Sequence, residues 1–135
     1  MRIELSTMQF RRLLDMVYIG NWILNATRGD DRILPYDEVE SLLFSHCEDA
    51  DMPTLFEHSE GEIIPSRAFA EGGIHEAIMD YEDTMFFEIL AEELARRDMQ
   101  EEHLDEDDMD ELNERITAYI SEFERNGTDN ISIDM

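Results

Sequence analysis

The sequence contains no lysine and only one cysteine, and both shortages narrow the class of protein. With Cys47 alone, neither an internal disulfide nor a multi-cysteine zinc site can form, which fits a reducing compartment. All ten basic residues are arginine, against 35 acidic residues, and the formal net charge is −25. Phosphate binding needs a basic surface, so we expect no direct binding to nucleic acid or to an anionic membrane.

Long apolar runs are also missing. No segment approaches the run of about eighteen apolar residues that a membrane helix requires. The first ten residues, MRIELSTMQF, lack the apolar centre of a signal peptide. We therefore expect a cytoplasmic protein with no membrane partner.

The residues that are present suit a folded protein. The chain has 135 residues, of which 42% are hydrophobic, so we expect one domain over residues 1–135 and not a disordered acidic tail. Its charge is uneven. Residues 1–47 hold seven acids and five arginines, net −2, while residues 48–135 hold twenty-eight acids and five arginines, net −23. This division predicts a core-forming first third and a strongly negative surface beyond it.

The clearest helix signals lie near the two ends of the chain. Ser6 and Gln9 form a capping-box pattern that predicts the start of a first helix. Beyond Asp15 this helix is apolar on its back as well, through Met16, Ile19, Trp22 and Ile23, which is typical of a central helix or a homodimer interface. A last helix is predicted between a capping pattern at Asp108 and Glu111 and a terminating glycine, Gly127.

The middle of the chain gives weaker signals. A second helix is predicted from Pro35 to Cys47, and a third from Ile74 with a break at Asp83–Thr84. Residues 48–73 are irregular, with one helical turn near 54–58 and a short extended piece at Ile63–Ile64. Ile131 and Ile133 alternate in the tail and can pair with Ile3 and Leu5. The predicted fold is thus mainly α: a compact helical domain of about four principal helices, with a central first helix and a minor terminal β ribbon.

Polar residues on the apolar face of the first helix mark a candidate site. At about 100° per residue, Asn21, Asn25 and Arg28 lie within about 60° of Phe10. Buried amides must be hydrogen-bonded, either to backbone and loop groups or within a small polar pocket. The candidate ligand-binding residues are Tyr18, Asn21, Trp22, Asn25 and Arg28.

Metal and catalytic motifs do not fit. In the acidic run 98–115, an EF-hand loop begun at Asp105 places Met109 at a ligand position, and one begun at Glu106 places Thr117 where Glu belongs. His46, Cys47 and His58 are an alternative set of transition-metal ligands. We assign no metal and no cofactor. Because no phosphate loop, nucleophile elbow or zinc-peptidase motif is present, a non-enzymatic role is favoured over an enzyme.

The acidic run itself suggests a function. Nine of the fourteen residues from Glu101 to Glu114 are acidic. Their spacing on a helix is comparable to that of charges along a nucleic-acid strand, so such a surface can compete for a basic protein. The alternatives are a solvated face that confers solubility and an adaptation to high salt. We therefore predict a non-enzymatic cytoplasmic binding or scaffold protein with an acidic face for a basic partner; a small enzyme or ligand-binding protein and a metal-binding protein remain alternatives.

Three segments resemble a family of small acidic bacterial cytosolic proteins to which no function is assigned. They are VYIGNWILNA (residues 17–26), YDEVESLLFS (36–45) and YEDTMFFEILAEELARRDM (81–99). The resemblance implies an intracellular, mostly helical protein. It implies no catalytic or binding residue.

Overall fold

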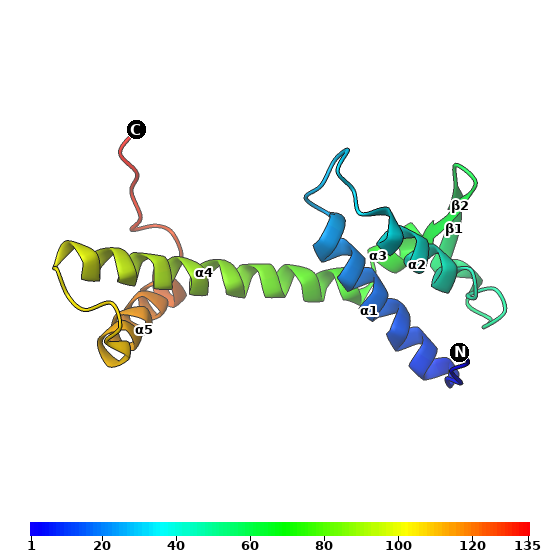
Figure 1. The fold of residues 1–135 in the computed structure, drawn as a ribbon, viewed down its shortest axis with the longest axis horizontal. Coiled ribbons are helices and arrows are strands. Elements are labelled where there is room, and N and C mark those ends of the chain that lie inside the picture. Colours follow the sequence, from blue (N-terminus) through cyan, green and yellow to red (C-terminus); the bar gives the residue numbers. More distant parts are fainter. The chain divides into compact units, whose positions relative to one another are not determined.

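The computed structural model describes all residues, 1–135, as five α-helices, one 3₁₀ turn and a two-stranded antiparallel ribbon (Figure 1). The predicted mainly helical class with a minor β ribbon is therefore confirmed. The chain divides into two compact units, Met1–Ile78 and Met79–Met135, and each is described by itself. None of the helices combines the length and the apolar character that crossing a membrane requires.

The first unit is built around α1 (Thr7–Asn25) and α2 (Leu34–Phe44). As predicted, α1 begins at a capping box, in which the Ser6 hydroxyl accepts the Gln9 N–H and the Gln9 side chain accepts the Ser6 N–H. Leu14 of α1 and Phe44 of α2 are fully buried and form one core with Cys47 and Phe69. The first helix thus lies in this core, although Met16 and Ile23 on its back are exposed.

The ribbon follows a 3₁₀ turn, η1 (Pro53–Leu55), and consists of β1 (Phe56–Ser59) and β2 (Glu62–Pro65). The predicted pairing of the chain ends, Ile3 and Leu5 with Ile131 and Ile133, does not form, and residues 56–58 are a strand and not a helical turn. The reason is loop closure. Glu60 and Gly61 both have positive φ, as a type I′ hairpin turn requires, so β1 and β2 meet across two residues.

A short helix, α3 (Arg67–Ala70), follows the ribbon and is capped by Ser66. Next, α4 (Gly73–Glu101) begins in the first unit and ends in the second. The predicted break at Asp83–Thr84 is wrong, because α4 is continuous there. Asp and Thr each reduce helix stability by well under about 1 kcal/mol, which a long helix tolerates.

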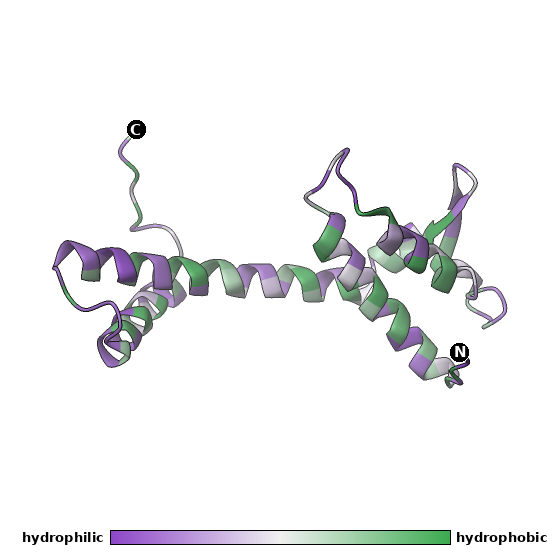
Figure 2. Ribbon diagram, in the orientation of Figure 1, coloured by the Kyte–Doolittle hydropathy of each residue, from purple (hydrophilic) through white to green (hydrophobic).

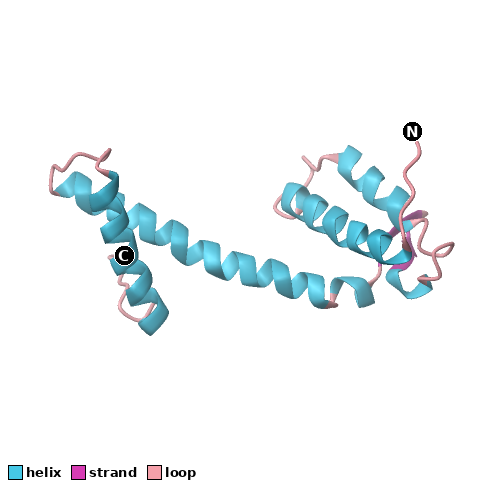
Figure 3. Cartoon of the chain, turned by 90° about the horizontal axis from the view of Figure 1, so that it is seen from below, coloured by secondary structure: helices cyan, strands magenta, loops and turns pink.

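The second unit consists of the rest of α4 and α5 (Met109–Asn126), which folds back against it (Figures 1 and 3). Ala95, Met99 and Leu112 are buried between the two helices, with Ile116 and Tyr119 packed beside them. As predicted, Asp108 caps α5, since its carboxylate accepts the Glu111 N–H at 3.2 Å, and Gly127 ends the helix at φ 56°. Residues 102–108 connect the helices.

Candidate functional site

Asn25 joins the end of α1 to the start of α2. Its side chain is 1% exposed. The amide nitrogen donates to Asn21 Oδ1 at 2.7 Å and to the Ile33 carbonyl at 3.2 Å, and the amide oxygen accepts the Ile33 N–H at 2.7 Å. All three bonds are internal and the side chain is buried, so Asn25 fixes the chain between the two helices and is not accessible to a ligand.

Asn21 connects this junction to a charged pair. Its amide nitrogen donates to Asp37 Oδ1 at 2.9 Å. Arg32 donates two hydrogen bonds to the same carboxylate, from Nε to Oδ2 at 2.6 Å and from Nη2 to Oδ1 at 2.8 Å. The Arg32 bond lowers the pKa of Asp37, partial burial opposes it, and the Asn21 bond lowers it further. The Arg32 charge is therefore neutralised locally by Asp37.

A cleft of about 280 Å³ opens beside this pair, between the second half of α1 and the start of α2. The structure brings three of the five predicted site residues, Tyr18, Asn21 and Trp22, to its wall. Arg28 does not reach it, because its guanidinium bonds the Leu24 carbonyl and Asp31. The residues that line the cleft are Tyr18, Asn21, Trp22, Ala26, Arg32 and Glu40.

Glu40 is the unusual member of the cleft. It is partly buried and forms no ion pair, unlike its neighbour Asp37. Burial raises the pKa of Glu40 to about 7; the Asn21 amide and Arg32 oppose the shift, and the charge of Asp37 adds to it. Burial, and then the nearby Glu40, also raise the pKa of Tyr18. The cleft thus contains one carboxyl group that exchanges a proton near neutral pH.

Tyr18 and Trp22, the two aromatic residues that line the cleft, are held in place by contacts within the first unit. Tyr18 packs edge to face on Phe69, with ring centroids 5.3 Å apart. Trp22 contacts the ring of His75 at 6.1 Å, and the buried Nδ1 of His75 has no hydrogen-bond partner. These contacts set the positions of both rings before any ligand arrives.

Sequence reasoning missed Arg32, Asp37 and Glu40. Acidic residues favour the first turns of a helix in general, so Asp37 and Glu40 give no separate signal of a site in the sequence. Their i, i+3 spacing places both residues on one side of α2. Whether that side faces Asn21 on α1 depends on the path of the loop of residues 26–33, which joins the two helices.

The alternative metal ligands do not come together. His46 is exposed in the turns after α2, Cys47 is buried, and His58 lies on β1. No group of three or more His, Cys, Asp or Glu side chains has a metal-binding arrangement. Burial raises the pKa of the Cys47 thiol, which makes it a poorer ligand and nucleophile.

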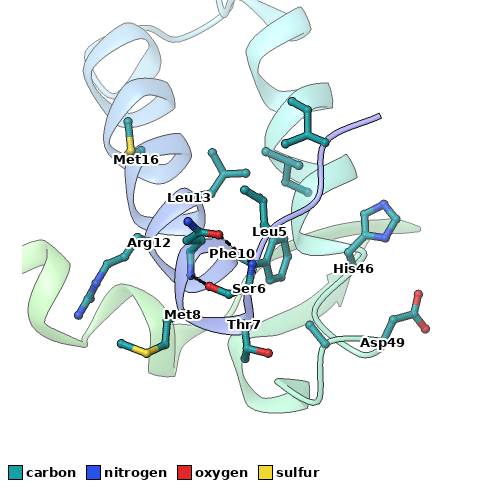
Figure 4. Close-up of a pocket in the computed structure, with 14 residues that line it drawn as sticks. Leu5, Ser6, Thr7, Met8, Phe10, Arg12, Leu13, Met16, His46 and Asp49 are labelled. Carbon is teal, nitrogen blue, oxygen red and sulfur yellow. Dashed lines mark hydrogen bonds between the residues drawn. The ribbon is translucent and has the colours of Figure 1, made fainter. Parts of the chain in front are cut away.

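A second concave surface is an apolar groove of about 980 Å³ between the N-terminal residues, the first half of α1 and the end of α2. Figure 4 shows Leu5, Phe10 and Leu13 gathered along it, with His46 and Asp49 on the other side. Its charged side chains are one base, Arg12, and one acid, Asp49. Their opposite charges do not select a particular partner.

The second unit carries most of the negative charge. Residues 79–135 hold twenty acids and four arginines, net −16. Three of these arginines form ion pairs: Arg96 with Glu92, Arg97 with Asp98, and Arg115 with both Glu102 and Glu111. The other sixteen carboxylates form none. Figure 2 shows hydrophilic residues along the end of α4, the connecting loop and α5.

Comparison with protein-family models, curated proteins and solved structures gave no match. The family resemblance of the three segments stays a prediction. Functional proposals therefore rest on the chemistry of the cleft and of the acidic surface.

Proposed function

We propose that this protein is a non-enzymatic, cytoplasmic binding protein whose acidic hairpin, residues 79–135, binds a basic protein. The observation that supports this proposal is the surplus of sixteen carboxylates without an ion pair in this unit. Fourteen of these charges lie on two packed helices and the short loop between them, so their spacing is fixed before a partner arrives; the other two, Asp129 and Asp134, lie in the tail after α5. A basic surface that normally binds nucleic acid would meet a comparable density of negative charge here.

The same charge argues against other partners. Nucleic acid and anionic membranes would be repelled by a net charge of −25. Negative charge that only confers solubility can be spread anywhere on the protein. Negative charge that binds a partner must be concentrated on one surface. The proposal therefore requires that partner contacts concentrate on the acidic hairpin and not on residues 1–78, which hold fifteen acids and six arginines, net −9.

Carbodiimide cross-linking tests this requirement. The reagent joins carboxylates to amines, and the chain has no lysine, so its carboxylates can form amide links only with its own N-terminal amine or with the lysines and N-terminal amine of a partner. We expect links between lysine-rich proteins and carboxylates of residues 79–135, at low salt, that excess DNA prevents. Links spread in proportion to acid content over both units, or resistant to DNA and salt, would contradict the proposal.

A second candidate function is ligand binding at the cleft on α1, which would suit a small enzyme as well as a binding protein. It is favoured by Glu40, a partly buried carboxyl group with no ion pair beside two aromatic rings. Trp22 is the only tryptophan, so its indole resonance reports on this cleft alone. A fragment library that leaves that resonance unmoved would remove this function.

The back of α1 is the surface that a homodimer would use. Met16 and Ile23, on the back of α1, are 70% and 60% exposed. A second copy would remove these side chains from water. Sedimentation at micromolar concentration tests this arrangement, and a monomer there would exclude it.

A further inference from the structure

The charge balance of the cleft on α1 and α2 favours a positive ligand. Arg32 is the only base in its lining, and Asp37 holds that guanidinium with two hydrogen bonds. Asn21 also donates to Asp37, which completes this network. Glu40 is the acidic group of the cleft that forms no ion pair.

We infer that the cleft binds an organic cation, with its ammonium group beside Glu40 and its carbon atoms against Tyr18 and Trp22. This inference rests on the second candidate function, ligand binding at the cleft. Aromatic rings attract ammonium groups through their negative faces, most strongly in the case of tryptophan. A carboxylate beside two such rings supplies both the charge and the apolar contact that an alkylammonium group needs.

Other ligand classes fit less well. An anion would meet an arginine that is already neutralised, within a chain of net charge −25. A metal ion would need several oxygen or nitrogen ligands, and no such cluster exists. The volume of about 280 Å³ is just below the usual range of about 300 to 1,000 Å³ for ligand pockets, so the cleft suits a small head group.

Binding should depend on pH, because the carboxylate form of Glu40 is the one that pairs with a cation. The groups that face Glu40 are Asp37 on its own helix, Arg32 in the preceding loop, and Asn21 and Tyr18 on α1. Their combined effect, with burial, leaves the pKa of Glu40 at about 7. With the carboxylate as the competent form, the affinity at pH 6 should be about tenfold weaker than at pH 8.

The ammonium group has two sources, a free small amine or a lysine side chain of a bound protein. Both present the same chemistry to the cleft. Choline and butylammonium serve as free probes, and a short peptide containing lysine or trimethyllysine serves as the other. A peptide that binds more tightly than the free probes identifies a protein side chain as the ligand, and the reverse identifies a small molecule; either result supports the inference.

The test is an NMR titration of the full chain at pH 8, observed through the indole N–H of Trp22. We expect saturable shifts with the cations, binding at least about tenfold weaker in Glu40→Gln, and unchanged binding in Glu38→Gln, an exposed glutamate on the same helix. Far-ultraviolet circular dichroism confirms that both variants fold. The neutral probe is 3,3-dimethylbutanol, which has the shape of choline without its charge, and butyrate is the anionic probe.

The outcomes separate the two claims. If 3,3-dimethylbutanol or butyrate binds as well as choline, or if Glu40→Gln binds choline normally, the cation assignment is wrong while ligand binding at the cleft stands. If neither these probes nor a broad fragment library moves the Trp22 resonance, both claims fail. The proposal for the acidic hairpin is unaffected in either case.

Discussion

At the scale of single residues, Asn25 shows how a polar side chain can hold two helices together. Replacing it with alanine leaves the Ile33 N–H and Asn21 Oδ1 without their partner, while the Ile33 carbonyl keeps only its bond from the Tyr36 N–H. Buried groups left unpaired cost about 1 to 3 kcal/mol. We expect Asn25→Ala to lower the free energy of unfolding by about 2 to 3 kcal/mol in urea titrations followed by Trp22 fluorescence.

Met16→Ala is the control for this prediction, because Met16 lies on the same helix and is 70% exposed. It should change the free energy of unfolding by less than about 0.5 kcal/mol. Equal effects of the two substitutions would show that the Asn25 network does not stabilise the fold.

Glu40 makes the stability of the first unit depend on pH. Burial raises the pKa of Glu40 from 4.5 to about 7, so the folded protein holds this proton more tightly than the unfolded chain does. Its contribution is complete below the unfolded pKa and is lost as the pH rises through about 7. We expect the urea midpoint of Glu40→Gln to exceed that of the wild type by a margin that grows from pH 5 to pH 8.

The exposed Glu38→Gln variant provides the comparison for this pH series. Its urea midpoint should follow that of the wild type across the whole range. A constant difference between Glu40→Gln and the wild type would mean that Glu40 titrates in the folded protein as it does in the unfolded chain.

The site was only partly predictable from these residues. Asn21 and Asn25 stood out because amides on an apolar helical face need partners, and Tyr18 and Trp22 are their neighbours on the same helix. In the structure the Asn25 side chain forms hydrogen bonds with the Ile33 backbone, and the Arg28 guanidinium donates to Asp31. Arg32 and Glu40 reach the cleft only through the path of the loop between α1 and α2, and no local pattern encodes that path.

At the scale of elements, helix caps were the most predictable features, because each is decided within a few residues. The Ser6–Gln9 box, the Asp108 cap and the terminating Gly127 are all present. Features that depend on competition between distant segments were predicted less well. The ribbon formed across the Glu60–Gly61 turn instead of between the chain ends, and α4 continued through Thr84.

The cap of α5 allows a matched test. The Asp108 carboxylate accepts the Glu111 N–H, whereas the adjacent Asp107 side chain forms no hydrogen bond. Losing a side-chain cap costs about 1 kcal/mol. We expect Asp108→Ala to destabilise the acidic hairpin by about this amount and Asp107→Ala to have little effect, as measured by amide hydrogen exchange in α5. Comparable exchange rates in both variants would contradict a capping role.

At the scale of the whole molecule, unpaired negative charge dominates the electrostatics. Nine of the ten arginines form ion pairs, with nine of the 35 acids, which leaves twenty-six carboxylates without one. Exposed pairs contribute only about 0 to 1 kcal/mol each. Repulsion among the remaining charges opposes folding, and it is the same surplus of charge that suits the acidic hairpin to a basic partner.

Salt should therefore stabilise the isolated protein while it weakens partner binding. Raising NaCl from about 10 mM to about 100 mM shortens the Debye length from about 30 Å to about 10 Å, which screens repulsion across the surface. If screening contributes about 1 kcal/mol, the melting temperature of a chain of this length should rise by about 4 °C. Calorimetry measures this rise, and sucrose at equal osmolality controls for effects of the solute other than its charge.

A variant with Glu101, Asp105, Glu106 and Asp107 changed to amides should respond less to NaCl, because it carries less repulsion to screen. A melting temperature that falls with NaCl would mean that the ion pairs outweigh the repulsion, and that the surplus charge does not strain the fold.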